Sequence, residues 1–89
     1  MKSKIEIHFV FADGVVKRCT AVKEAYEFLM GHYAFIQHME EDNEPLGKDD
    51  YILTVLSSGL SADDETFINR QVSFNKEAQL GVSDDKIIN

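Results

Sequence analysis

Three histidines and one cysteine are the residues of this sequence whose side chains could bind a metal ion or catalyse a reaction. His32 and His38 are six residues apart, whereas metal-binding pairs on a helix are spaced i, i+4 so that both rings share a face. On a strand, the same spacing would place the two rings roughly 20 Å apart. His8 could meet either of them only across a sheet. We therefore predict no metal site and no cofactor.

Cys19 is the only cysteine, so the chain can form neither an internal disulfide nor a thiolate zinc site. The strand pattern places it on an apolar face beside Ile7, where burial disfavours the reactive thiolate. Residues 57–59 lack the nucleophile elbow, and no phosphate-binding or dinucleotide-binding motif occurs. We predict no catalytic residues and a non-enzymatic function. The opposing hypothesis is a small enzyme or ligand binder that uses His8, Cys19 or His38 with a carboxylate.

Acidic side chains are the other group with chemical potential, because the chain has sixteen acidic and nine basic residues and a net charge of −7. An EF-hand loop beginning at Asp42 would place Leu46 and Leu53 at two ligand positions, so the calcium motif fails. We instead predict that two acidic segments form one patch that attracts a basic protein partner. The predicted partner-binding residues are Glu40, Glu41, Asp42, Glu44, Asp49, Asp50, Asp63, Asp64 and Glu65.

Basic residues are scattered, which argues against direct binding of nucleic acid and of anionic membranes. The predicted function is therefore a small interaction protein that blocks or regulates a protein partner. In size and charge alone, the chain resembles acidic inhibitors that mimic DNA, such as viral anti-defence proteins encoded by phages. The alternative is a homo-oligomeric assembly domain with an exposed aromatic patch. Its candidate residues are Phe28, Tyr33, Phe35 and Phe74. Of these, Phe28 and Phe35 lie off the main helical stripe.

The chain ends and the cysteine content bear on the compartment. The N-terminal residues alternate at once and contain no apolar run of the signal-peptide kind, and no stretch approaches the roughly 18–20 apolar residues of a membrane span. With a single cysteine, these features predict a reducing, cytoplasmic location.

A β-hairpin is predicted near the N-terminus, because residues 5–11 alternate and Asp13-Gly14 follows. A three-residue loop with Gly14 in the left-handed conformation pairs Ile7 with Cys19 and His8 with Arg18. This register buries apolar side chains against apolar ones, so we prefer it to a two-residue loop.

The remaining elements predict an α+β domain over residues 1–81 with a tail over 82–89. Helical spacing begins after Thr20, the predicted N-cap, and either ends at Gly31 or continues through it. The helix packs on a small, mostly antiparallel sheet, as ββαβ or ββαββ. We predict a loop over residues 40–50 and a central strand over 51–56. We also predict a C-terminal helix over 62–72 with a capping box at Ser61.

Overall fold

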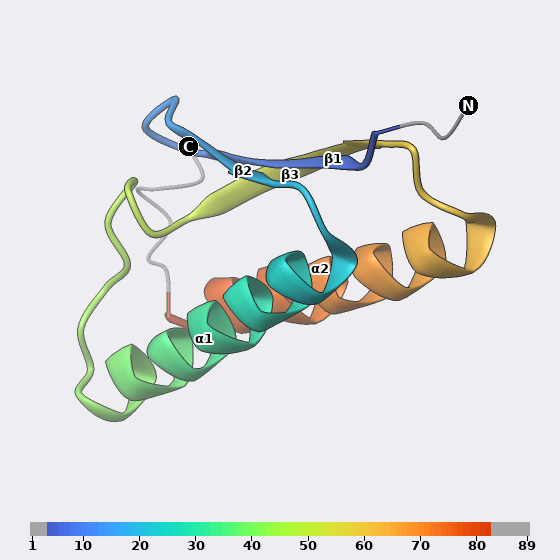
Figure 1. Cartoon of the computed structure of the whole chain (residues 1–89). Coiled ribbons are helices and arrows are strands. Elements are labelled where there is room, and N and C mark those ends of the chain that lie inside the picture. The colour runs from blue at the N-terminus through green and yellow to red at the C-terminus, as the bar shows by residue number, and fades with distance from the viewer. Residues whose placement is uncertain (1–3, 83–89) are drawn as a thin grey trace.

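The computed structural model describes residues 4–82 and has three strands and two helices in the order ββαβα. The elements are β1 (Glu6–Phe11), β2 (Val16–Cys19), α1 (Val22–Glu41), β3 (Ile52–Ser58) and α2 (Ala62–Val82). The antiparallel sheet has the strand order β2-β1-β3, and both helices cover the same face of it (Figure 1). This arrangement confirms the predicted α+β class.

The hairpin has the predicted register. Ile7 lies opposite Cys19 and His8 opposite Arg18. Gly14 adopts a positive φ of 92°, which the three-residue loop requires and which a side chain disfavours. One face of β1 is thereby buried under the helices, while the other face of the sheet is uncovered in residues 4–82 (Figure 1).

Helix α1 runs through Gly31, which decides between the two predicted layouts in favour of one long helix. It ends in a Schellman motif, because the N–H of Asn43 donates to the Glu40 carbonyl and the N–H of Glu44 donates to the Met39 carbonyl. Asn43 has a φ of 56° and takes the left-handed position that glycine usually occupies. The helix therefore stops at an asparagine and not at its glycine.

The start of α1 differs slightly from the prediction. Its N-cap is Ala21, which makes no side-chain cap, and not Thr20. The carboxylate of Glu24 instead accepts a hydrogen bond of 2.9 Å from the Thr20 N–H. A first-turn acid thus accepts from the backbone N–H just before the helix, and its charge lies near the positive end of the helix dipole.

Strand β3 lies at an edge of the sheet, so the predicted central position is wrong. The centre is β1, because the β1–β2 hairpin occupies one side of it and β3 adds to the other. Apolar residues on both sides of β3 suggested burial, but Leu56 is 60% exposed. The buried amide of Gln79 closes part of the free edge by pairing with both the N–H and the carbonyl of Ile52.

Helix α2 begins as predicted, with the Ser61 hydroxyl accepting from the Asp64 N–H at 3.1 Å. It continues about ten residues past the predicted end at residue 72 and includes Gly81. The missed turns have polar side chains on the buried stripe, namely Asn75 and Gln79, both 0% exposed. An apolar periodicity cannot detect them. The predicted tail lies outside the described residues except for Val82, with which α2 ends.

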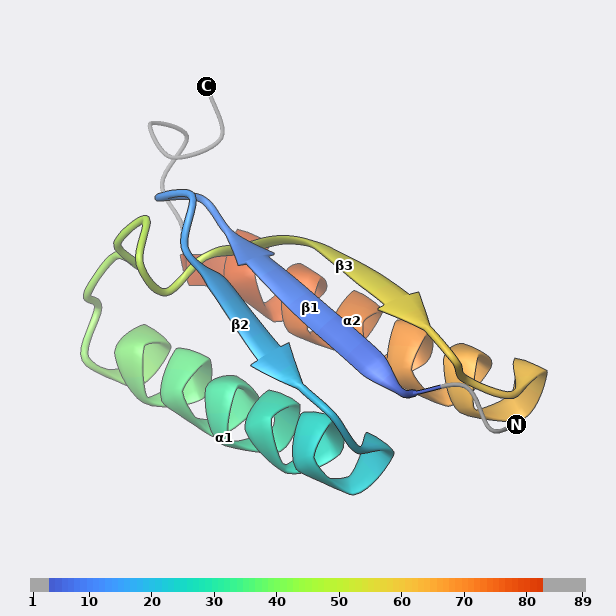
Figure 2. The same cartoon turned by 45° about the horizontal axis from the view of Figure 1, so that its top comes forward.

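Both helices run in the same direction, because β3 carries the chain back along the sheet between them (Figure 2). The main core lies between sheet and helices and includes Phe9, Leu29 and Ile68. A smaller core of Ile36, Leu46 and Tyr51 lies where α1 ends. This second core anchors the segment that connects α1 to β3.

Candidate functional site

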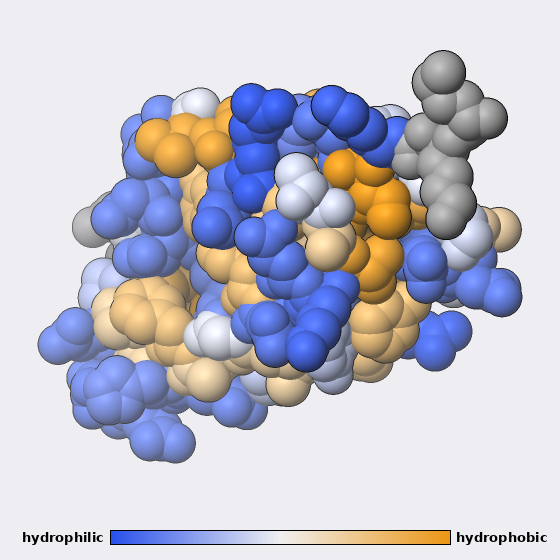
Figure 3. All heavy atoms as spheres, viewed as in Figure 1, coloured by the Kyte–Doolittle hydropathy of each residue, from blue (hydrophilic) through white to orange (hydrophobic). Residues whose placement is uncertain are grey.

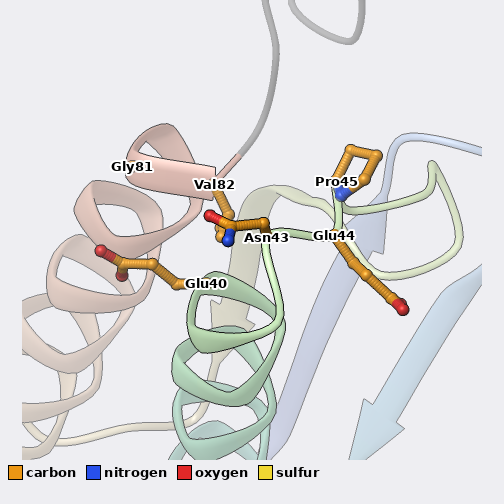
Figure 4. A pocket seen from close by; sticks show the side chains of 6 residues that line it. All are labelled: Glu40, Asn43, Glu44, Pro45, Gly81 and Val82. Atoms are coloured by element: carbon orange, nitrogen blue, oxygen red, sulfur yellow. The ribbon is translucent and has the colours of Figure 1, made fainter.

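The two acidic segments lie at opposite ends of α2, so the predicted single patch is wrong. Figure 4 shows the end of α1 beside the end of α2, where Glu40 and Glu44 line a cavity of about 280 Å³ with Gly81 and Val82. Asp63, by contrast, is in the first turn of α2. The 21 residues of α2 span about 30 Å at the helical rise per residue. Because the helices are parallel, the acidic segment that follows α1 meets the C-terminal end of α2 and not its start.

At the α2 start, the acidic residues have a local structural role. Asp63, Asp64 and Glu65 occupy the first turn, next to the Ser61 cap. Carboxylates there interact favourably with the positive end of the helix dipole and with its free N–H groups. Helix stability alone therefore accounts for these three residues.

A second group of acidic residues surrounds the segment that precedes β3. We call this group the loop end and define it by Asp13, Glu27, Asp49 and Asp50. Burial and the neighbouring negative charges of Asp49 and Asp13 raise the pKa of the Asp50 carboxyl above its ordinary value, against a smaller opposing effect of His32. Within residues 4–82, no salt bridge involves any of these four carboxylates. No cation of the described chain is therefore within salt-bridge distance of them.

A groove of about 420 Å³ opens at the loop end, between α1 and the segment before β3. Three aromatic side chains and one imidazole form its walls, and carboxylates from two different segments border it. The lining residues are Phe11, Glu27, Phe28, Gly31, His32, Phe35, Asp49 and Asp50. We call it the aromatic groove. It combines apolar rings with convergent charged groups, as small-ligand and side-chain pockets usually do.

The helical spacing of α1 explains the groove wall. Phe28, His32 and Phe35 follow one another at i, i+4 and i+7, so they share one side of the helix. The rings of Phe28 and His32 are stacked at 6.2 Å, and the Phe11 ring stands edge-on to both, at 6.1 and 6.3 Å. Gly31 lies between them and carries no side chain, and a Cβ built there would meet no atom within 4 Å. The floor of the groove is therefore open at that position.

His32 is held at the base of the groove by a hydrogen-bond chain between the helices. Its Nε2 lies 2.6 Å from the carbonyl oxygen of Asp50, and its Nδ1 lies 3.0 Å from the amide nitrogen of Asn75. Since a carbonyl only accepts, Nε2 carries the proton and Nδ1 accepts from Asn75. The same amide donates to the Leu29 carbonyl, and its oxygen accepts from Gln71. Burial lowers the pKa of His32, so the neutral ring is favoured.

The other candidate catalytic residues lie apart from this groove and from one another. His8 is on the uncovered face of the sheet, where Glu6 bridges it to Arg18 at 3.2 and 3.1 Å. Cys19 is buried under the sheet, and burial raises the pKa of its thiol. His38 lies 3.2 Å from Asp42 at the end of α1. The expectation of a non-enzymatic function stays a prediction.

Within residues 4–82, no group of three His, Cys, Asp or Glu side chains is placed to hold a metal ion. Neither of the two helices in that range has a stretch long and apolar enough to cross a membrane.

The four aromatic residues of the predicted apolar patch fall into two places. Phe28 and Phe35 line the groove. The rings of Tyr26 and Phe67 pair between the two helices with centroids 4.9 Å apart. Tyr33 and Phe74 come seven residues after them, which continues a row along the same side of each helix. In the space-filling view, hydrophobic areas are separate and divided by hydrophilic side chains (Figure 3). They form no single large patch on that face.

The groove is the main evidence for the function of this chain. Neither protein-family models nor curated proteins nor solved structures match this chain. Sequence reasoning identified Asp49, Asp50 and the position of Phe28 and Phe35 off the main helical stripe. It missed Phe11 and His32, because only the folded chain brings a hairpin strand and a buried histidine to the same groove.

Proposed function

We propose that this chain is a protein-interaction domain that binds a basic protein partner at the loop end and thereby blocks or regulates it. The observation that supports this most is the aromatic groove with carboxylates on two sides. Glu27 comes from α1, while Asp49 and Asp50 come from the segment before β3. A basic surface that approaches this end would meet negative charge first and an apolar recess behind it.

The proposal is narrower than the two-segment patch predicted from the sequence. A continuous row of carboxylates that could stand in for a nucleic-acid backbone would need both acidic segments on one surface. Residues 40–44 are separated from residues 63–65 by the length of α2. What remains is a localised anionic site, with Asp50 as its most buried carboxylate.

A second candidate function is self-association through the junction of α1 and α2. Phe67 is 44% exposed and Phe74 is 52% exposed. Tyr26, Met30 and Tyr33 follow the matching side of α1 at helical spacing. This row of apolar and aromatic side chains contains no carboxylate, so two copies of an acidic chain could meet there with little repulsion.

The main proposal is tested by affinity capture from a host lysate at low and raised salt with three forms of the chain. The first is the wild type, the second carries Asp49→Lys with Asp50→Lys, and the third carries Asp63→Lys with Asp64→Lys. We expect a captured protein that is lost at raised salt and with the loop-end reversal but retained by the α2-start reversal. Circular dichroism melts of all three forms verify that each is folded.

Capture that depends equally on both reversals would contradict the localised site, and capture that neither salt nor reversal affects would contradict its electrostatic nature. Light scattering at several concentrations tests the second candidate. A dimer that Phe74→Ser dissociates would support self-association, and a monomer at high concentration would exclude it.

A further inference from the structure

The aromatic groove has chemistry for one specific kind of side chain. Its rings supply apolar and π surface, its carboxylates supply negative charge, and its open floor at Gly31 leaves room for an inserted group. A purely apolar occupant would leave Asp50 desolvated without a counter-ion, and an anionic occupant would be repelled. The walls and the charge together therefore favour a cation with a flat or aliphatic body.

We propose that the aromatic groove binds the side chain of an arginine from the partner, which deepens the proposed function and rests on it. A planar guanidinium can stack on an aromatic ring while its N–H groups pair with carboxylates, whereas a lysine ammonium offers a single compact charge. Phe28 and Phe35 provide the rings, and Asp49 and Asp50 provide the acceptors on the opposite border. Arginine is thus favoured over lysine.

The chain itself shows that one of these rings accepts a cation. The ammonium of Lys17 lies 5.8 Å from the centroid of the Phe28 ring. Lys17 extends from β2 and is exposed, and it is not among the residues that line the groove. Its charge lies near the site and repels a second cation. Lys17→Gln is therefore expected to strengthen arginine binding, by about twofold to fivefold for one removed exposed charge.

Gly31 provides a variant that blocks the groove without weakening the fold. A Cβ at this position meets no atom within 4 Å, and leucine is a better helix former than glycine. Gly31→Leu should therefore raise the melting temperature while it fills the floor of the groove. The matched control is Gln37→Leu, which adds the same side chain to an exposed position of α1 outside the groove.

The test is an NMR titration of the ¹⁵N-labelled chain with three short peptides that differ only at their central residue. The probes are Gly-Ser-Arg-Ser-Gly, its lysine twin and its citrulline twin, all with blocked ends. Citrulline keeps the shape of arginine but has no charge. We expect the arginine peptide to shift the amides of Gly31, Phe35 and Asp50 and to bind at least about tenfold tighter than the citrulline peptide.

Variants of the chain test which residues bind the arginine peptide. Gly31→Leu, and separately Asp49→Asn with Asp50→Asn, should each weaken arginine binding by about tenfold. Gln37→Leu and Asp63→Asn should leave it within about twofold, as distant, independent sites do.

Equal binding of the citrulline and arginine peptides, or a titration in which the groove amides do not move, would overturn the inference. So would arginine binding that Gly31→Leu leaves unchanged. If a basic partner still requires Asp49 and Asp50 but ignores Gly31→Leu, the arginine inference fails while the proposed function stands. If the loop-end reversal also has no effect on partner binding, both fail.

Discussion

The α2 start and the loop end carry similar numbers of acidic residues, yet their charges act on the fold in opposite ways. At the α2 start, Asp63 and Asp64 lie in the first helical turn, where the dipole and the Ser61 cap favour negative charge. At the loop end, burial and then the charges of Asp49 and Asp13 raise the pKa of Asp50, so the ionised carboxylate is less favourable there. The fold explains acidic residues that stabilise their own helix, whereas a carboxyl with a raised pKa beside a groove is a candidate for a binding site.

The largest expected effect comes from the small core that positions the loop end. Leu46 is 1% exposed and packs with Ile36 and Tyr51. Leu46→Ala should reduce the free energy of unfolding by about 2–4 kcal/mol, because it leaves a cavity that the loop fills only in part. Urea denaturation measures the loss.

Hydrogen exchange of the Leu46→Ala variant shows whether the loop end and the α2 start lose protection to different extents. Amides of the segment 47–51 should exchange much faster in Leu46→Ala, while those of the first turn of α2 keep their relative protection. Uniformly faster exchange at both ends would mean that Leu46 does not anchor the loop end specifically.

The next largest effect is the dependence of folding stability on pH that His32 causes. The pKa of His32 is lowered by burial from its ordinary value of 6.5. The unfolded state therefore binds more protons, and the contribution of His32 is complete above about pH 6.5 and is lost as the pH falls below it toward the folded pKa. We expect stability to fall as the pH is lowered through about 6.5, by no more than about 1.4 kcal/mol per pH unit, which is the limit for a single titrating group.

Two histidine variants test this assignment. His32→Asn should be less stable than the wild type at pH 7 but should lose less stability on acidification. His38→Gln, which alters an exposed side chain at the end of α1, should keep the wild-type pH dependence. Equal slopes for the wild type and His32→Asn would show that another group titrates.

A smaller effect is expected at the α2 start. Ser61→Ala removes the hydroxyl that accepts from the Asp64 N–H and should cost about 1 kcal/mol, as the loss of an N-cap usually does. His32 in the groove contacts Asn75, which lies about 20 Å along α2 from Ser61, so peptide binding in the groove should not change. A thermal melt and one peptide titration measure both quantities.

The smallest effects have opposite signs in the two regions. Asp50→Asn should raise the free energy of unfolding at pH 7 slightly, because a carboxyl with a raised pKa is destabilising when it is ionised and solvent screening keeps this effect small at a partly exposed site. Asp63→Asn should lower it by about 0.3–1 kcal/mol through the helix dipole. If both substitutions changed stability in the same direction, the contrast between the two regions would be wrong.

The sequence predicted the hairpin register and the start of α2 because single residues decide them. Gly14 in the turn and Ser61 at the cap each favour one local geometry. The sequence left the end of α1 open between Gly31 and a longer helix, and it placed the end of α2 too early. Asn43 replaces the expected glycine at the end of α1, and Asn75 and Gln79 replace apolar residues on the buried stripe of α2. Polar residues in structural positions carry no periodic apolar signal.

The candidate site was predictable only in part. The acidic composition before β3 and the off-stripe positions of Phe28 and Phe35 are local features of the chain. That Asp50 meets His32, and that both lie beside Phe11, depends on the parallel packing of the two helices under the sheet. The same packing separates Asp63 from the loop end. Such a contact is set by topology, which composition and spacing do not encode.

The carboxyl ¹³C titration of Asp50, recorded with and without the arginine peptide, tests the central claim most directly. In the free chain its pKa should lie above the ordinary value of 3.8, owing to burial and its acidic neighbours. Bound guanidinium should lower that pKa, because a nearby cation favours the ionised carboxylate, and the citrulline peptide should leave it unchanged. A pKa that the arginine peptide does not move, in a chain whose groove amides report binding, would contradict the account.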